Sequence, residues 1–213
     1  MEVINKNKLF LALIFNALIV VLEIIALFLS INRHGINVFL YYTENSNYFS
    51  LIVSLIFCGI LIYSLIKHKN LPKFIIILRY MATICLTITF LVVIFLLVPL
   101  KPSMASYLIL EDSSLYQHVL CPILSVISFL IFEPAIRLNK REIIWGIIPT
   151  IIYGVIIITL NILKIIIGPY PFFYVYNIPW YLTVLTCGGI FTLGVAVAFI
   201  VLFVQNRVLK KRI

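Results

Sequence analysis

Six long runs of apolar residues alternate with short polar connections along the chain. The runs cover approximately residues 9–30, 45–66, 74–98, 114–132, 143–163 and 179–204. Each is close to the roughly 20 residues that a helix needs to cross about 30 Å of hydrocarbon. Apolar and polar residues do not alternate within the runs, and the runs are too long for barrel strands. The pattern therefore predicts an all-α membrane protein, a six-transmembrane-helix bundle that forms one domain over 1–213.

Composition supports a membrane protein. The 213 residues are 64% hydrophobic and 11% charged, more apolar surface than a soluble domain of this length can bury. The net charge of +9 comes from short basic clusters between the runs. This distribution is typical of membrane topology signals, so we expect no nucleic-acid partner.

The basic residues also predict an orientation. Most of the 16 Lys and Arg residues, Arg79 included, fall on one side of the predicted bundle, and the other side holds Arg33, Lys101 and Lys164. The positive-inside rule then places both termini in the cytoplasm of a multi-pass cell-membrane protein. Polar and aromatic residues gather in the outer connections, where we expect any active site. The sequence leaves the oligomeric state open.

Thr43 and His118 are the strongest candidates for chemistry. Thr43 precedes the second run, where it fits either a helix N-cap or a nucleophile that needs a neighbouring base. Ser114 and Gln117 fit a capping box that would place His118 in the first turn of the fourth helix. The start of a helix disfavours a protonated imidazole, and a general base has to be neutral. A histidine that merely satisfies its hydrogen bonds at the interface is the alternative.

Several nearby side chains fit either a structural or a supporting role. Asn45, Ser46 and Asn47 either satisfy backbone groups at a helix end or donate hydrogen bonds to an oxyanion. Asp112 complements a helix dipole or orients His118.

Glu23 is the only carboxylate that the pattern places well inside a run. It is expected to pair with Arg33, to orient His118 or to remain protonated. Cys121 follows His118 by three residues on the same helix face, so a Cys–His pair is conceivable. No second pair of ligands accompanies it, and neither a metal nor another cofactor is expected.

The loop around Tyr170 is rich in aromatic residues and proline. It reads Gly168-Pro169-Tyr170-Pro171-Phe172-Phe173-Tyr174. Such a composition suits an interfacial loop at the level of the lipid headgroups.

Three motifs carry a resemblance to a known family. They are Tyr42-Thr43-x-x-Ser46-Asn47, Leu115-Tyr116-Gln117-His118-Val119-x-x-Pro122 and Gly168-Pro169-Tyr170-Pro171-Phe172. In this order, over nearly the whole chain, they resemble the signatures of the Pr6Pr-type bacterial six-span membrane proteins, although Phe173 and Tyr174 shift the aromatic spacing of the third. That group is similar to the androgen-induced membrane proteins, which hydrolyse fatty-acid esters of hydroxy fatty acids. The resemblance implies a threonine nucleophile at Thr43 and a histidine base at His118.

Two functions therefore stand side by side. One is an intramembrane hydrolase of a membrane lipid or lipid-like ester, with its Thr–His pair near the outer face. The other is a binding or transport module, such as the six-span substrate-capture subunit of a vitamin transporter. Those subunits usually carry Ala-x-x-x-Ala in the first span, and Ala12, Ala17 and Ala26 lack that spacing. A non-catalytic protein of the same fold is a third possibility.

Overall fold

The computed structural model describes residues 6–134 and 137–212, and this part of the chain is a bundle of helices without strands. Six helical stretches are long and apolar enough to cross a membrane, as the sequence predicts. The chain is a multi-pass membrane protein. Five of the stretches are built on α1 Lys6–His34, α2 Tyr42–Lys67, α3 Lys73–Val92, α8 Glu142–Ile162 and α9 Trp180–Arg212. The remaining stretch, the fourth along the chain, combines α6 Asp112–Ser114, η4 Leu115–Leu120, α7 Cys121–Ile127 and η5 Ser128–Phe132.

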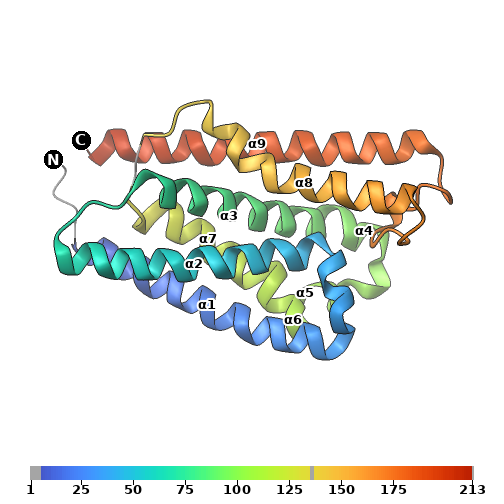
Figure 1. Ribbon diagram of the computed structural model, residues 1–213, viewed down its shortest axis with the longest axis horizontal. Helices are drawn as coiled ribbons and strands as arrows, with labels where there is room; N and C mark the ends of the chain where they lie inside the picture. Colours follow the sequence, from blue (N-terminus) through green and yellow to red (C-terminus); the bar gives the residue numbers. More distant parts are fainter. Residues whose placement is uncertain (1–5, 135–136, 213) are drawn as a thin grey trace.

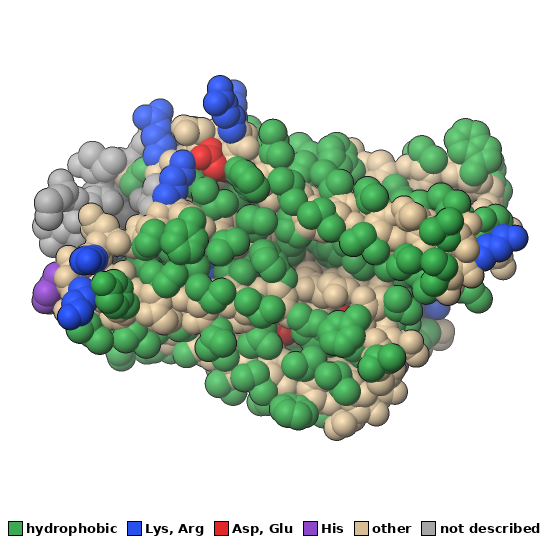
Figure 2. All heavy atoms as spheres, in the orientation of Figure 1, with side chains coloured by type: hydrophobic (Ala, Val, Ile, Leu, Met, Phe, Trp, Pro, Cys, Tyr) green, Lys and Arg blue, Asp and Glu red, His purple; other side chains and the backbone are tan. Residues whose placement is uncertain are grey.

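Short helical segments complete the loop end of the bundle. They are η1 Gly35–Leu40, η2 Val93–Leu97, α4 Val98–Leu100, η3 Pro102–Met104, α5 Ala105–Ile109 and η6 Pro171–Phe173. Helix α3 lies at the centre, packed against α2, α7, α8 and α9, while α1 packs against α2 and the fourth span (Figure 1). Helix α1 begins and α9 ends at the same end of the bundle, and most of the Lys and Arg side chains visible in Figure 2 gather there.

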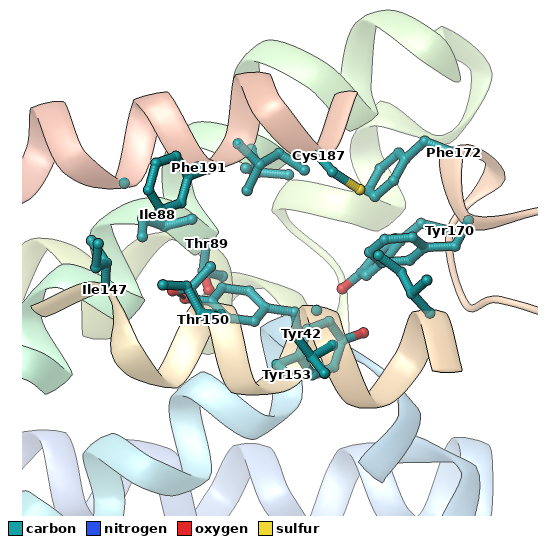
Figure 3. A pocket seen from close by; sticks show the side chains of 18 of the residues that line it. Tyr42, Ile88, Thr89, Ile147, Thr150, Tyr153, Tyr170, Phe172, Cys187 and Phe191 are labelled. Carbon is teal, nitrogen blue, oxygen red and sulfur yellow. Dashed lines mark hydrogen bonds between the residues drawn. The ribbon is translucent and has the colours of Figure 1, made fainter. Parts of the chain in front are cut away.

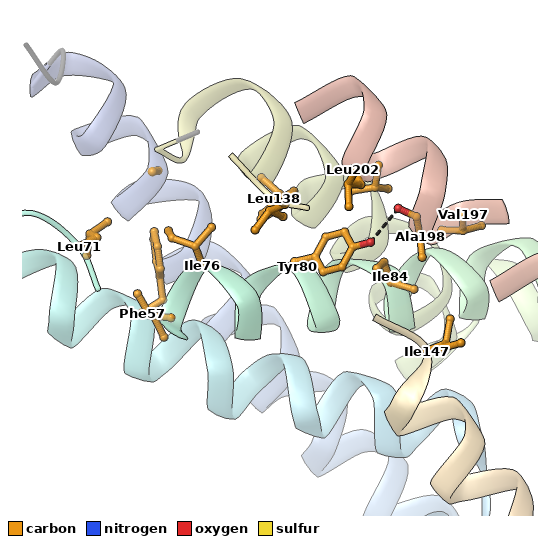
Figure 4. Packing of buried hydrophobic residues seen from close by; sticks show 14 of the residues in the cluster. Phe57, Leu71, Ile76, Tyr80, Ile84, Leu138, Ile147, Val197, Ala198 and Leu202 are labelled. Atoms are coloured by element: carbon orange, nitrogen blue, oxygen red, sulfur yellow. Dashed lines mark hydrogen bonds between the residues drawn. The ribbon is translucent and has the colours of Figure 1, made fainter. Parts of the chain in front are cut away.

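The apolar core follows α3. Tyr80 and Ile84 are fully buried, and the Tyr80 hydroxyl donates a hydrogen bond of 2.8 Å to the carbonyl of Ala198 on α9 (Figure 4). Gly146 lets α8 approach this core, because a Cβ at that position would collide with Ile84. Close approach of helix backbones at small residues is a usual source of helix association in membranes.

Prolines explain two wide turns in the helices. Val93–Leu97 and Leu115–Leu120 are π-helical, and they precede Pro99 and Pro122. A proline has no N–H, and its ring displaces the carbonyl four residues earlier, which for Pro122 belongs to His118. The helix therefore widens at the candidate base.

By its place in the sequence, Arg79 counts among the basic residues of one side of the bundle, but the structure buries this residue within the third span. Its side chain is fully buried in α3 and forms an ion pair of 2.8 Å with the equally buried Glu133. Ser54 and Ser125 accept further hydrogen bonds from the guanidinium at 3.1 and 3.4 Å. The half of the bundle in which α1 begins thus holds a buried ionic centre, and Arg79 does not count toward membrane orientation.

Candidate functional site at the start of α2

Two cavities meet at the start of α2. A polar cavity of about 320 Å³ is lined by Thr43, Glu44 and His118 together with residues of the segments at the loop end of the bundle. An apolar cavity of about 210 Å³ lies between α3, α8 and α9. The linings of the two cavities share Thr43 and Tyr170. The structure therefore places the candidate nucleophile at the junction and brings the candidate base into the same polar cavity.

Thr43 lies inside the first turn of α2. The helix begins at Tyr42, after Tyr41 in an extended conformation with ψ 134°, so the N-cap prediction for Thr43 is wrong. The first N–H groups of a helix have no partner within the helix. The Thr43 N–H instead donates to the Tyr170 hydroxyl at 3.3 Å, which fixes the loop containing Tyr170 over the start of α2.

His118 is held by a different partner from those that the sequence suggests. Its Nδ1 lies 2.6 Å from the carbonyl oxygen of Leu108 on α5. A carbonyl only accepts, so Nδ1 carries a proton and Nε2 of a neutral ring is left as the basic nitrogen. The capping-box prediction is wrong, because Ser114 makes no capping hydrogen bond and Gln117 donates to Glu44 at 2.6 Å.

Glu44 is the polar residue of the site that sequence reasoning missed. It is 7% exposed and accepts hydrogen bonds from Ser30 at 2.5 Å, Tyr48 at 2.8 Å and Gln117 at 2.6 Å. Three donors satisfy the hydrogen-bonding capacity of this buried carboxyl group. Glu44 and His118 line the same polar cavity. Its position directly after Thr43 in the sequence could have indicated that Glu44 belongs to the site. A carboxylate in a first helical turn, however, usually only complements the helix dipole.

Ser46 and Asn47 support the backbone rather than facing the cavity as donors. Asn47 directs its amide nitrogen at the carbonyl oxygens of Thr43, at 2.6 Å, and Gln117, at 3.2 Å. Ser46 lies 3.0 Å from the Thr43 carbonyl and 2.7 Å from the Thr89 hydroxyl. These contacts engage the donors that the oxyanion interpretation requires, and the two residues instead fix the first turn of α2.

Asp112 and Glu23 make their contacts away from Thr43 and His118. Asp112 forms an ion pair of 2.9 Å with Arg33, and the Arg33 guanidinium also lies over the Tyr107 ring at 4.2 Å. Asp112 therefore does not orient His118, and Arg33 does not pair with Glu23. Glu23 is fully buried beside the Cys121 thiol. Cys121 thus contacts Glu23 on α1, while His118 contacts α5.

The Tyr170 loop folds back onto the bundle. Tyr170, Phe172 and Phe173 are buried, with the Tyr170 and Phe172 rings stacked at 5.2 Å. Gly168 permits this fold, because a Cβ there would lie 2.8 Å from the backbone oxygen of Phe173. Burial raises the pKa of Tyr170 to about 12, while hydrogen bonds from Thr43 act in the opposite direction. Packing of three aromatic rings holds the loop in this position.

The apolar cavity extends away from Thr43 toward the lipid-facing surface. Figure 3 shows Tyr170 and Phe172 at one end, with Ile147 and Phe191 toward the other. Val155 on α8 and Phe191 on α9 line the cavity and are 60% and 49% exposed. The space between α8 and α9 is therefore open to the bilayer, which suits the tail of a lipid.

Comparison of the chain with protein-family models, with curated proteins and with solved structures found no match. Within residues 6–134 and 137–212, His, Cys, Asp and Glu form no group of three that could hold a metal ion.

Proposed function

We propose that the protein is an intramembrane lipid-ester hydrolase with Thr43 as the nucleophile and His118 as the base. The position of Thr43 carries the proposal. It lines an apolar cavity open to the bilayer and a polar cavity that contains a histidine with a free basic nitrogen. A lipid ester has the same two parts, an apolar chain and a polar carbonyl group.

The reaction begins with transfer of the Thr43 hydroxyl proton to Nε2 of His118. The Thr43 oxygen attacks the ester carbonyl and forms a tetrahedral intermediate. The intermediate collapses to a threonyl ester as the C–O bond to the alcohol breaks and His118 returns the proton to that alcohol. Water, deprotonated by His118, then cleaves the threonyl ester and releases the fatty acid.

Leu108 and Glu44 support the base during these steps. The Leu108 carbonyl keeps the proton on Nδ1, so that Nε2 faces the reaction. The Glu44 carboxylate, which lines the same cavity, stabilises the imidazolium that forms after proton transfer. The buried Tyr170 hydroxyl accepts the Thr43 N–H, so its own proton can be donated to the developing oxyanion.

The membrane orientation belongs to the same proposal. The basic side chains at the end where α1 begins and α9 ends favour cytoplasmic termini. The polar cavity lies at the opposite end of the bundle, so the ester is taken from the outer leaflet of the cell membrane. Labelling of single cysteines introduced at positions 69 and 140 tests this, because reagents outside intact cells are expected to reach neither.

The hydrolase proposal is tested in nanodiscs with a fluorophosphonate probe and long-chain p-nitrophenyl esters. Thr43→Val keeps the shape of the side chain and removes its hydroxyl, so it is expected to abolish labelling and hydrolysis. Thr192→Val is the matched control, because Thr192 is exposed on α9 and its hydroxyl donates only to the Gly188 carbonyl. Hydrolysis by Thr43→Val at the control rate excludes Thr43 as the nucleophile.

The connected cavities also favour a second candidate, a module that binds a lipid-like molecule without cleaving it. The polar lining beside Lys101 and His34 fits a head group, and the apolar part fits a chain. This function requires no activated hydroxyl. Saturable binding of a radiolabelled ester, with neither probe labelling nor product, would establish the binding module in place of the hydrolase.

A further inference from the structure

Four fully buried side chains on α1 and α2 have oxygen atoms without a hydrogen-bond partner. Oδ1 of Asn16 lies beside the Arg79–Glu133 ion pair, and the other three side chains contribute both carboxyl oxygens of Glu23, Oδ1 of Asn47 and Oγ of Ser50. A buried polar atom that is left unpaired destabilises the folded protein, so such atoms usually indicate a ligand or ordered solvent.

The oxygens of Glu23, Asn47 and Ser50 lie at similar heights along the bundle. The hydrogen bond between Ser30 and Glu44 fixes the register of the antiparallel helices α1 and α2. From that bond, seven residues along α1 descend about 10.5 Å to Glu23, and six residues along α2 descend about 9 Å to Ser50. Asn47 lies about one turn nearer the polar cavity. Since all three side chains are fully buried, they face the interior at this level.

The fourth span packs beside these side chains of α1 and α2. The Cys121 thiol lies beside the Glu23 carboxyl group. The Asn47 amide donates to the carbonyl of Gln117 at 3.2 Å. Gln117 and Cys121 are about one helical turn apart on the same span. Glu23 and Asn47 therefore border one seam, formed by α1, α2 and the fourth span.

The Glu23 carboxyl group also has no basic partner. Among the residues that the structure describes, no basic side chain forms an ion pair with Glu23. The buried guanidinium of Arg79 is occupied by Glu133. A buried carboxylate requires a countercharge, and carboxylate, amide and hydroxyl oxygens are the ligands that hard cations prefer.

We propose that Glu23, Asn47 and Ser50 bind a monovalent metal cation, with sodium as the ion to test. One positive charge balances the single carboxylate, and Asn47 and Ser50 contribute neutral oxygens. Asn47 also holds the Thr43 carbonyl at 2.6 Å. The cation would therefore link the middle of the bundle to the first turn of α2. This proposal does not depend on ester hydrolysis.

The first measurement uses the wild-type protein in nanodiscs. Its thermal midpoint is followed by circular dichroism while sodium chloride replaces choline chloride at constant ionic strength. Binding to the folded state alone raises the midpoint in a saturable way, whereas choline cannot enter the seam. Equal midpoints in the two salts would overturn the proposal and leave water or a proton as the partner of these oxygens.

Variants then locate the site. Glu23→Gln is expected to abolish the sodium response, and Ser50→Ala to raise the half-saturating concentration by about threefold or more, because one ligand is lost. Glu142→Gln is the matched control, since Glu142 pairs with Lys73 at the opposite end of the bundle. Binding of radioactive sodium to the folded variants, with one ion per wild-type chain, gives a second readout. A Glu23→Gln protein that binds sodium like the control would refute the assignment.

Discussion

Replacing Glu133 by an uncharged residue is expected to destabilise the protein more than the same replacement of an exposed carboxylate. Arg79 and Glu133 are both 0% exposed as side chains, and the Arg79 Nε and Nη2 atoms lie 3.0 and 2.8 Å from the same carboxyl oxygen. Ser128 and Asn16 donate to that oxygen at 2.8 and 3.1 Å. Glu133→Gln keeps the shape of the side chain but leaves the guanidinium buried without its countercharge.

The expected loss follows from the complete burial of the pair. Breaking one partner of a buried ion pair destabilises a protein by about 3–5 kcal/mol. For a chain of this size, each kcal/mol lowers the melting temperature by about 2–4 °C, so the expected fall is about 6–20 °C. The control is Glu142→Gln, whose partner Lys73 is 47% exposed. The Glu142 side chain itself is 9% exposed, but Lys73 stays solvated when its partner changes. Losing this partly exposed pair is therefore expected to cost about 1 kcal/mol, so the control should lose about 4 °C or less.

Unfolding is measured with a thiol-reactive fluorophore in detergent micelles. Cys85 and Cys121 are buried, so both become reactive as the bundle opens. The double replacement Arg79→Met with Glu133→Leu is expected to recover most of the loss, because an apolar pair has no charge to desolvate. A Glu133→Gln protein that melts within a few degrees of the Glu142→Gln control would refute the reasoning.

Three further changes follow from the packing and the two cavities. Gly146→Ala is expected to destabilise the protein by about 1–3 kcal/mol in thermal unfolding, because its Cβ would collide with buried Ile84, whereas Gly59→Ala has open space and should show no loss. Since the pKa of Tyr170 is raised to about 12, folded stability should decline as pH rises from about 10 to 12, and Tyr170→Phe should reduce this decline in alkaline titrations followed by circular dichroism. Gly154→Leu adds a side chain to the apolar cavity, so it should slow hydrolysis of long-chain esters about tenfold or more while sparing acetate esters, as initial rates would show.

The sequence predicted the number of membrane helices because span length and hydropathy are local properties. A run of about 20 apolar residues has few alternatives to crossing the bilayer as a helix. The largest difference in bounds is at the end of α9, which continues to Arg212, and smaller differences occur at the loop end of the bundle. Helix α1 continues to His34, and α2 begins at Tyr42. Short polar residues can extend a helix there because their side chains satisfy the end groups, and hydropathy carries no record of this.

Contacts within the site were less predictable, because they depend on which spans are neighbours. Thr43 and His118 line one cavity as expected, but the Leu108 carbonyl that holds His118 belongs to the short helix α5. Backbone carbonyls leave no mark in a sequence. Arg79 and Glu133 are 54 residues apart, so nothing local relates them. Pro122, in contrast, was a usable signal for the wide turn at His118.

The uneven distribution of buried polar residues explains why the site lies at the start of α2. Spans one, two and four carry buried polar side chains along much of their length, whereas those described on α8 lie near its ends, at Glu142 and Asn161. The polar cavity and the apolar cavity meet at the start of α2, where both are lined by Thr43 and Tyr170. Thr43 at that boundary lines the polar cavity and the apolar cavity at once. No further charged group has to be exposed to lipid for this. A reactive hydroxyl elsewhere on α2 would face one environment only. Moving the hydroxyl by one turn, with Thr43→Val combined with Asn47→Thr, should therefore not restore hydrolysis in the ester assay. Recovery of activity in that protein would show that the junction of the two cavities is not what defines the site.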